Sequence, residues 1–259
     1  LGPSSQARSS SPCMPARREL HTGRYNFLHR SWGPIEPFDD SMPSILKHNG
    51  VHSHLISDHY HYWEDGGCTY HPRYKTWEIE RGQEGDPWKA HLPHIDIPET
   101  VDGRGGDWFR QDRVNRLYMQ REEDFCQART VSRALEFLET NRGEDNWFLH
   151  VETFDPHEPY FAPQKYRDMY KDNYAGNPFD WPPYRRIEET PEEIAHVRNE
   201  VAALTSFCDA QLGRILDFMD AHNLWEDTML IVNTDHGFLL SEHDWWGKVV
   251  MPFYQEIVH

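Results

Sequence analysis

A cysteine set between two prolines is the first feature of this chain that suggests chemistry. Residues 11–25 read SPCMPARRELHTGRY, so Pro12 and Pro15 restrict the backbone on both sides of Cys13. Arg17 follows four positions later. A cysteine that only packs needs an apolar pocket and none of this pattern. Whether Cys13 packs, pairs, binds a metal or reacts depends on the chemistry that the rest of the chain supplies.

The stretch VNTDHGFLLSEHDWWGK carries an acid, an imidazole and a lysine. Asp235 and His236 end an apolar run, residues 228–237, that we expect to be a buried strand. A carboxylate suits a hard cation such as calcium, and an added imidazole admits manganese or zinc. Lys248 follows a short loop and can bring a positive charge to an anion at the same edge. Taken alone, the Asp-His pair is better explained as a turn cap beside a packed histidine.

Three more histidines have a chemical context. His157 lies in FDPHEP between Pro156 and Pro159, and an imidazole fixed in this way suits proton transfer or an anion contact. A surface histidine in a proline-rich loop fits that pattern equally well. His59 and His61 are two positions apart and face the same way on an extended backbone, so both can reach one ligand. The alternative is a pair of loop histidines beside aromatic residues.

The periodicity of the chain places these residues on an α/β framework. Helices are predicted at 40–49, at 121–139 and from Thr190, where TPEE is a capping box with proline at the first helical position. Strands are predicted at 51–58, 146–154 and 228–237. Helices alternating with apolar strands indicate a mainly parallel sheet, whose chemistry lies beyond the carboxyl ends of the strands. The polar pairs after these strands should therefore meet at one edge.

Composition narrows the function further. The chain has 43 acidic and 26 basic residues and a net charge of -17, which argues against a nucleic-acid-binding surface. No run of 18 apolar residues occurs, so no membrane span is predicted. The four cysteines are far apart and without a CxxC pattern, which favours the cytoplasm but leaves a periplasmic or secreted location open. Residues from about 65 to 120 lack periodicity and are predicted to form an irregular, aromatic-rich insertion.

Residues 13–17, CMPAR, resemble the C-x-P-x-R signature of the sulfatase family in the alkaline-phosphatase superfamily. Thr22, Gly23 and Arg24 match the continuation of that signature, and FDPHEP and TDHG…EH…WGK follow in the family's order. The resemblance implies an alkaline-phosphatase-like α/β/α sandwich with a mainly parallel central sheet. It also implies that a maturation enzyme oxidises Cys13 to formylglycine, and that the protein hydrolyses a sulfate ester.

The resemblance assigns a role to each candidate residue. The hydrated aldehyde at position 13 attacks sulfur through one hydroxyl, and the other hydroxyl then expels sulfate. Arg17 holds the formylglycine and the metal, and His157 and Lys248 contact the sulfate and the leaving oxygen. Asp235 and His236, with the modified Cys13, bind a divalent cation, which in this family is most often calcium.

The sequence departs from the family pattern in two places. Twelve residues precede Cys13 and none is acidic, so the upstream aspartate ligands of the family are absent. Residues 57–61, SDHYH, replace the family's Lys-x-His, and His59 and His61 are expected to take over the work of that lysine. We therefore expect residues 1–259 to be part of one catalytic domain, truncated at both ends and without its first metal-binding strand and C-terminal subdomain. Alone, such a piece should be unstable and inactive.

Three alternatives stay open. A phosphonate or phosphate ester hydrolase can use the same scaffold, because tetrahedral oxyanions of similar size fit similar sites. A non-catalytic relative would keep Cys13 unmodified. A cysteine hydrolase with Cys13 as thiolate and His157 as base would leave Asp235 and His236 without a role. For the main hypothesis the substrate is a small sulfated sugar or aryl sulfate, for which the aromatic residues of the insertion can provide a stacking wall.

Overall fold

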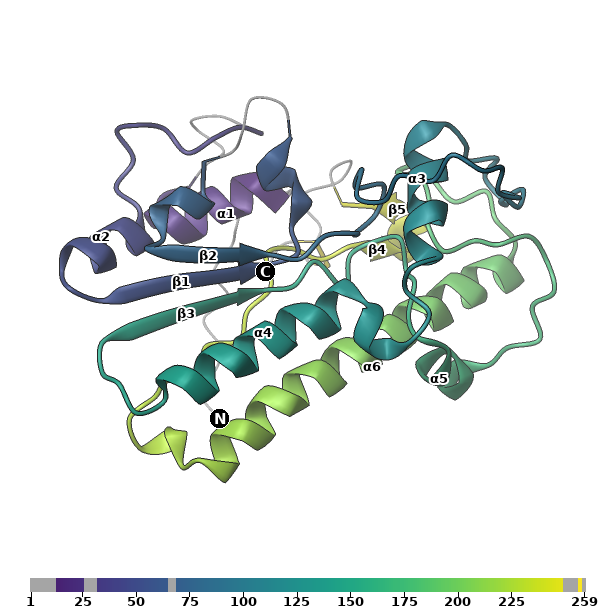
Figure 1. Ribbon diagram of the computed structural model, residues 1–259. Helices are drawn as coiled ribbons and strands as arrows, with labels where there is room; N and C mark the ends of the chain where they lie inside the picture. Colours follow the sequence, from purple (N-terminus) through teal and green to yellow (C-terminus); the bar gives the residue numbers. More distant parts are fainter. Residues whose placement is uncertain (1–12, 26–31, 65–68, 249–255, 258–259) are drawn as a thin grey trace.

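Three parallel strands form the sheet of this protein. The computed structural model describes residues 13–25, 32–64, 69–248 and 256–257 (Figure 1). The central strand is β1 (His52–Ser57), with β2 (Thr76–Ile79) on one side and β3 (Trp147–Glu152) on the other. Both neighbours run parallel to β1. The predicted parallel α/β architecture is therefore confirmed.

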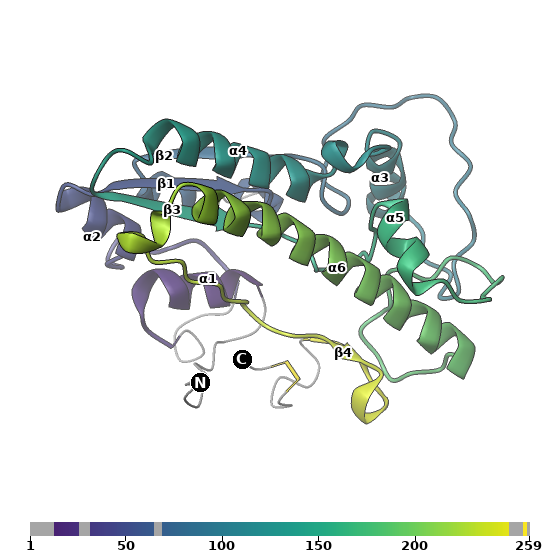
Figure 2. The same cartoon turned by 90° about the horizontal axis from the view of Figure 1, so that it is seen from below.

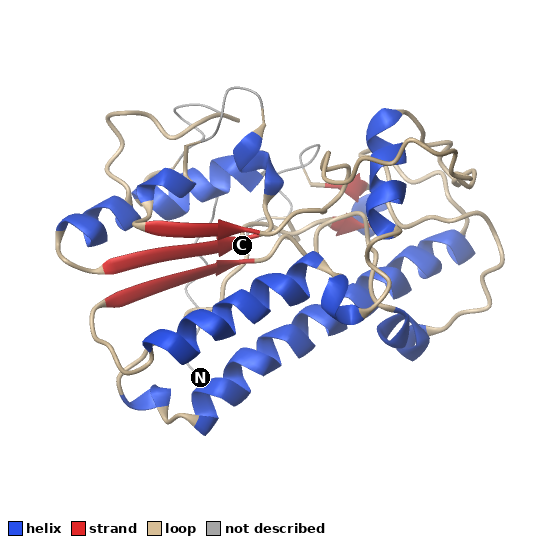
Figure 3. Ribbon diagram, viewed as in Figure 1, coloured by secondary structure: helices blue, strands red, loops and turns tan. Residues whose placement is uncertain are grey.

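The remaining elements surround the sheet or extend beyond its end, as Figure 3 shows by colour. They are α1 (Cys13–Thr22), α2 (Met42–His48), α3 (Asp107–Arg116), α4 (Cys126–Asn141), α5 (Gln164–Arg167), α6 (Pro191–Ala221), and the two-residue strands β4 (Leu239–Leu240) and β5 (Trp246–Gly247). The short strands β4 and β5 pair antiparallel.

Alternating side chains of the strands supply the cores on the two faces of the sheet. Leu55 and Phe148 pack with Met14 of α1 on one face. Leu149, the next residue of β3, packs with Leu138 of α4 on the other face. Because successive strand residues point to opposite faces, one short strand serves both cores. Figure 2 shows α1 and α4 on opposite sides of the strands.

The longest helix begins where its capping residues predict. Thr190 accepts a hydrogen bond from the backbone N–H of Glu193, and the Glu193 carboxylate accepts one from the Thr190 N–H. Pro191 occupies the first helical position, where its missing N–H costs nothing. The helix α6 then packs along α4, and both cover the same face of the sheet. The thirty-one-residue helix ends beside the start of β3, and the segment after it returns to the carboxyl end of the sheet.

The predicted buried strand at 228–237 is wrong. This segment forms no ladder with the described strands, and Met229, Ile231 and Val232 are 81%, 70% and 64% exposed. An apolar run becomes a buried strand only where a neighbouring strand satisfies its backbone and a second layer covers its side chains. In the described part of the chain the sheet ends at β3, so neither condition is met.

The segment at 65–120 is less irregular than predicted. It contributes β2 to the sheet and contains α3. Both were missed because β2 has four residues, of which three are exposed, and α3 is dominated by charged side chains. Helix α4 starts at Cys126 rather than at residue 121, because residues 122–124 form a 3-10 turn. Within the described residues, we find no helix with the length and apolar character that a membrane crossing requires.

Candidate active site

The predicted site residues meet at the carboxyl end of the sheet. Cys13 is the first residue of α1 and is 3% exposed. Its Sγ lies 3.3 Å from Nε2 of His236, 3.7 Å from Nε2 of His157 and 3.8 Å from Nζ of Lys248. Three motifs separated by up to 235 positions therefore converge on one sulfur atom. In a modified protein, the oxygens of the aldehyde hydrate would occupy the place of this sulfur.

These neighbours make the surroundings of Cys13 strongly favourable to negative charge. Burial raises the pKa of the Cys13 thiol, but the charge of Lys248 and the hydrogen bonds with His157 and His236 outweigh it. The thiol pKa is consequently held well below its ordinary value of 9.0. The same cations would stabilise a sulfate or phosphate oxygen placed here.

Arg17 connects the helix that carries Cys13 to two other parts of the site. Its Nη1 donates to the backbone carbonyl of Cys13 at 2.9 Å and to Oδ2 of Asp235 at 2.8 Å. Its Nε donates to the carboxylate of Glu152, the last residue of β3. One buried guanidinium thus fixes the backbone of Cys13, the strand end and Asp235 relative to one another.

His157 and Lys248 form a second buried group with Glu158. Nζ of Lys248 lies 3.3 Å from Oε1 of Glu158 and contacts Nε2 of His157. Nδ1 of His157 donates to the backbone carbonyl of Glu158 at 2.5 Å, which leaves Nε2 directed at Cys13. Burial lowers the pKa of His157, but the negative charges of Glu158 and Glu84 raise it to about 9 despite Lys248. The two carboxylates therefore favour the protonated form of the ring.

Asp235 and His236 present donor atoms that suit a metal ion. Together with Cys13 they place one ligand atom each within 4.8 Å of one another. Nδ1 of His236 donates to the carbonyl of Gly237 at 2.9 Å, which directs its Nε2 toward Cys13 and the space between the three donor atoms. Burial raises the pKa of Asp235, but His236 and Arg17 outweigh it and hold that pKa below its ordinary value. The donor set fits a divalent cation, although calcium takes six to eight oxygens and needs further ligands.

His59 and His61 lie beside the site and do not contact the Cys13 sulfur. The extended backbone expected there ends at His59, because a 3-10 turn begins at Tyr60. The His59 ring is fully buried, with Nε2 3.3 Å from Sδ of Met14. The two imidazole rings are 5.0 Å apart in an edge-to-face arrangement. The two rings are neighbours, but a turn rather than the predicted extended backbone places them side by side.

Sequence reasoning missed the carboxylates that hold the cations. Glu152 binds Arg17, Glu158 binds Lys248, and Glu84 approaches His157. Glu152 is the last residue of the apolar strand, and Glu158 lies between His157 and Pro159 in the FDPHEP motif. Their positions in the sequence could therefore have marked both as candidates. Glu84 belongs to the irregular segment, where no local pattern marks it.

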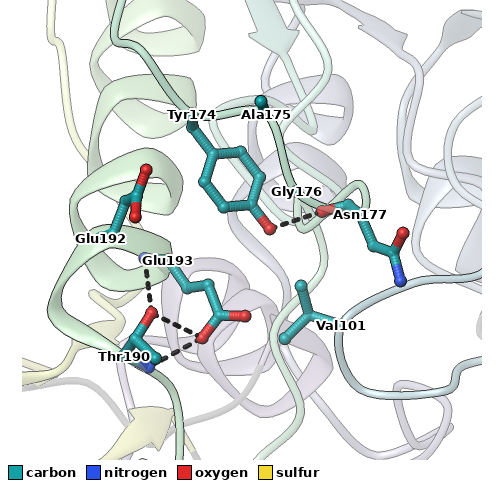
Figure 4. Close-up of a pocket in the computed structure, with 8 residues that line it drawn as sticks. All are labelled: Val101, Tyr174, Ala175, Gly176, Asn177, Thr190, Glu192 and Glu193. Atoms are coloured by element: carbon teal, nitrogen blue, oxygen red, sulfur yellow. Dashed lines mark hydrogen bonds between the residues drawn. The ribbon is translucent and has the colours of Figure 1, made fainter.

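A surface pocket away from these residues offers no comparable chemistry. It measures about 430 Å³ and lies between residues 174–177 and the start of α6 (Figure 4). The Tyr174 hydroxyl donates to the Asn177 backbone, and Glu193 is turned back to cap Thr190. Glu193 is committed to the helix end, and the described residues that line the pocket include no cysteine or histidine, so we place the site at Cys13.

Solved structures with an alkaline-phosphatase-like fold match the fold of this chain. A phosphonate monoester hydrolase of Agrobacterium radiobacter superimposes with a TM-score of 0.66 at 16% identity, covering 98% of this chain and 59% of its own. A structure solved with D-glucosamine-2-N,6-O-disulfate as substrate gives 0.65 at 13% identity, covering 98% and 62%. At these identities the likeness shows the fold alone.

The sulfatase family model matches residues 4–253, and the chain belongs to the sulfatase family. An ulvan-active sulfatase of Formosa agariphila is 29% identical over 95% of this chain and 44% of its own length. A choline-sulfatase of Rhizobium meliloti is 24% identical over 93% of this chain and 51% of its own. The chain thus spans about half the length of these relatives. The family predicted from the three motifs is confirmed.

Proposed function

We propose that the protein is a formylglycine-dependent sulfuric ester hydrolase and that Cys13 is the residue converted by a maturation enzyme. The observation that carries the proposal is the convergence of His236, His157 and Lys248 within 3.3–3.8 Å of the Cys13 sulfur. A packed cysteine needs no cations, whereas an ester sulfate bound beside position 13 needs several. The family membership of the chain supports the same reading.

Each side chain has a distinct role in this reaction. A formylglycine hydrate supplies one hydroxyl to attack sulfur and a second that makes release of sulfate possible. Lys248 neutralises a sulfate oxygen, and the His157 imidazolium donates its Nε2 proton to the leaving oxygen. Glu158 keeps both of these cations in place. Arg17 holds the backbone of residue 13 so that the reacting group stays within their reach.

We further propose that Asp235, His236 and the modified residue 13 hold a divalent cation, with calcium as the ion and manganese or zinc as alternatives. Such an ion would polarise the sulfate group. The orientation of the His236 ring and the low pKa of Asp235 support this assignment. Further ligands are needed to complete a calcium site.

The proposed substrate is a small sulfated sugar or aryl sulfate. Two matched proteins have names that point to sulfated saccharides, the ulvan-active sulfatase and the structure with a disulfated glucosamine. His59 and His61 are linked to His157 through ring contacts with Phe154. Of the two we assign contact with the alcohol part of the substrate to His61, because the His59 ring is fully buried. Residues 1–259 remain proposed as part of a single catalytic domain.

Mass spectrometry of the Cys13 peptide tests the proposal first. The protein is expressed from its complete reading frame with a formylglycine-generating enzyme, and conversion lowers the peptide mass by about 18 Da. The matured protein is then assayed with 4-nitrophenyl sulfate, a sulfated monosaccharide panel, and a phosphonate monoester. Modification with sulfate release supports the proposal. Preferred phosphonate cleavage favours the alternative hydrolase, and an unmodified thiol without turnover favours a non-catalytic protein.

A further inference from the structure

A buried glutamate from the irregular segment reaches the rings of the site. The Glu84 side chain is 3% exposed, and its Oε1 lies 3.3 Å from Nδ1 of His157. Its Oε2 accepts a hydrogen bond from the Tyr60 hydroxyl at 2.9 Å and lies 3.9 Å from Nε2 of His61. One carboxyl group therefore stands between the imidazole that faces Cys13 and the imidazole beside it.

The backbone at Glu84 is held in an uncommon conformation. Its φ is +45°, in the left-handed region that a non-glycine residue enters at a cost of about 1–2 kcal/mol. The side-chain amide of Asn115 donates to the carbonyls of Glu84 and Asp86, at 3.2 and 2.8 Å, and Gln83 donates to Asp58 at 2.9 Å. Such conformations persist where the surroundings fix them, commonly at functional sites. These bonds fix the direction of the Glu84 side chain.

The partners of Glu84 distinguish it from a carboxylate buried for stability. Within the described residues, its ion-pair contacts are the two histidines, and no arginine or lysine lies within such contact. Burial raises the pKa of Glu84 to about 7, and His157 opposes that rise. At a position that serves packing alone, an apolar side chain would avoid the desolvation cost of a buried carboxyl group. In both protonation states an oxygen of Glu84 faces Nδ1 of His157.

We propose that Glu84 is a positioning residue for this site, whose carboxyl oxygen fixes the His157 ring with Nε2 on residue 13 and links it to His61. The inference rests on the proposed function, because it gives Glu84 a role through His157. Nδ1 of His157 already donates to the Glu158 carbonyl. The Glu84 carboxylate, which comes from the segment at 65–120, places a second acceptor oxygen 3.3 Å from the same nitrogen. Without it, among the described residues only residue 158 holds Nδ1 of the ring, while Nε2 keeps its contacts with Cys13 and Lys248.

The test uses matured, metal-loaded protein from the complete reading frame, with 4-nitrophenyl sulfate as the probe. Glu84→Ala should lower kcat about 10- to 100-fold with KM within about twofold, because a misplaced proton donor affects the chemical step. Glu84→Gln should recover most of kcat, since the amide oxygen can still accept from Nδ1. Glu80→Ala is the control, because Glu80 lies in the same segment but pairs with Arg129. A kcat for Glu84→Ala equal to that of this control overturns the proposal.

A second substrate, a crystal structure and a second variant separate the role of Glu84 from the proposed function and from a folding defect. If 4-nitrophenyl sulfate is not cleaved but a phosphonate monoester is, the proposed function fails, and the same variants are compared with the phosphonate. A crystal structure of Glu84→Ala is independent of turnover: a rotated His157 ring supports the role of Glu84, and an unchanged ring contradicts it. If Glu84→Ala does not fold, Tyr60→Phe removes the bond that holds Oε2 and should lower kcat about threefold.

Discussion

Arg17 and Asp235 are separated by 218 positions in the chain and joined by a hydrogen bond of 2.8 Å between Nη1 and Oδ2. The same guanidinium donates to the Cys13 carbonyl and to Glu152. Helix α1, the end of β3 and the segment after α6 are therefore fixed to one another through a single side chain. The residue that holds the backbone of Cys13 thus also supports the fold around it.

The first prediction concerns the stability that Arg17 contributes. Arg17→Met should lower the free energy of unfolding by about 3–5 kcal/mol, because it leaves the buried Glu152 carboxylate without its partner. Urea denaturation followed by tryptophan fluorescence measures the loss. The proteins are made without the maturation enzyme, so that all of them carry Cys13.

Arg133→Met is the matched control for this loss. Arg133 is 49% exposed and pairs with Glu80 and Glu136 at the surface. Surface pairs of this kind contribute about 0–1 kcal/mol, so the control should unfold close to the wild type. If both variants lose the same free energy of unfolding, the ion pairs of Arg17 contribute no more to stability than those of a surface arginine.

Local sequence patterns were sufficient to predict part of the framework and the residues that converge around Cys13. The capping box at Thr190 and the apolar run before Glu152 depend on neighbours in the chain, and both appear in the structure as predicted. The proline-bracketed motifs around Cys13 and His157 also hold their residues locally. Because parallel strands end at one edge, these motifs could be expected to meet before any contact was known.

The predictions that failed concern residues whose surroundings are supplied by distant parts of the chain. Burial of residues 228–237 requires a neighbouring strand, which no property of that run can reveal. The position of Glu84 depends on Asn115 and Tyr60, which belong to other segments. A carboxylate in an irregular stretch looks like any surface acid until its partners are known.

A second prediction follows from two buried carboxyl groups beside the site. Asp58 accepts hydrogen bonds from the Phe154 N–H at 2.6 Å and from the Gln83 side chain at 2.9 Å. Its negative charge adds to the effect of burial in raising the pKa of nearby Asp155. Burial raises the pKa of Asp58 to about 7 and that of Asp155 to about 8, from an ordinary 3.8. Between those values the folded protein keeps protons that the unfolded chain has released.

Stability from these groups is thus complete at low pH and lost as the pH rises toward 7 and 8. The free energy of unfolding should fall from about pH 5 to about pH 8.5, by at most about 1.4 kcal/mol per pH unit for each proton. Denaturation of Asp155→Asn should show a shallower slope than the wild type. Asp168→Asn, at an exposed surface pair with Lys171, should keep the wild-type slope. A variant slope as steep as the wild type would exclude Asp155 as a source.

The third prediction concerns the space at Gly85, next to Glu84. A Cβ there would lie 1.8 Å from Cδ1 of Trp108, whose ring contacts Trp181 at 4.7 Å between centroids. Gly85→Ala should therefore destabilise the protein by about 1–3 kcal/mol, as added volume does in packed regions. It should also lower kcat, because the displaced segment carries Glu84.

Gly213→Ala provides the comparison for Gly85. Gly213 lies within α6, and its added Cβ would meet nothing within 4 Å. Alanine is the better helix former by about 1 kcal/mol, so this variant should match or exceed the wild type in stability and retain kcat. If Gly85→Ala is as stable as Gly213→Ala, Trp108 moves aside without cost and the packing argument fails.

The last prediction tests the cation site by stability rather than by turnover. An ion that binds only the folded protein raises the free energy of unfolding, by about 2.7 kcal/mol at a concentration of one hundred times Kd. Calcium should produce this rise in the wild type and not in Asp235→Asn, which loses a charged ligand of the proposed set. Asp227→Asn, an exposed acid earlier in the same segment, should respond to calcium like the wild type.

Proton competition gives the same experiment a second readout. Burial lowers the pKa of His236, but Asp235 and Cys13 outweigh it and raise that pKa above 6.5. An ion bound through Nε2 must displace a proton from this ring, so the stabilisation by calcium should weaken as the pH falls. Manganese and zinc, titrated in parallel, show which ion the site prefers. Equal stabilisation of Asp235→Asn and the wild type would place the ion elsewhere, because the remaining donors, one imidazole and residue 13, are too few to hold calcium.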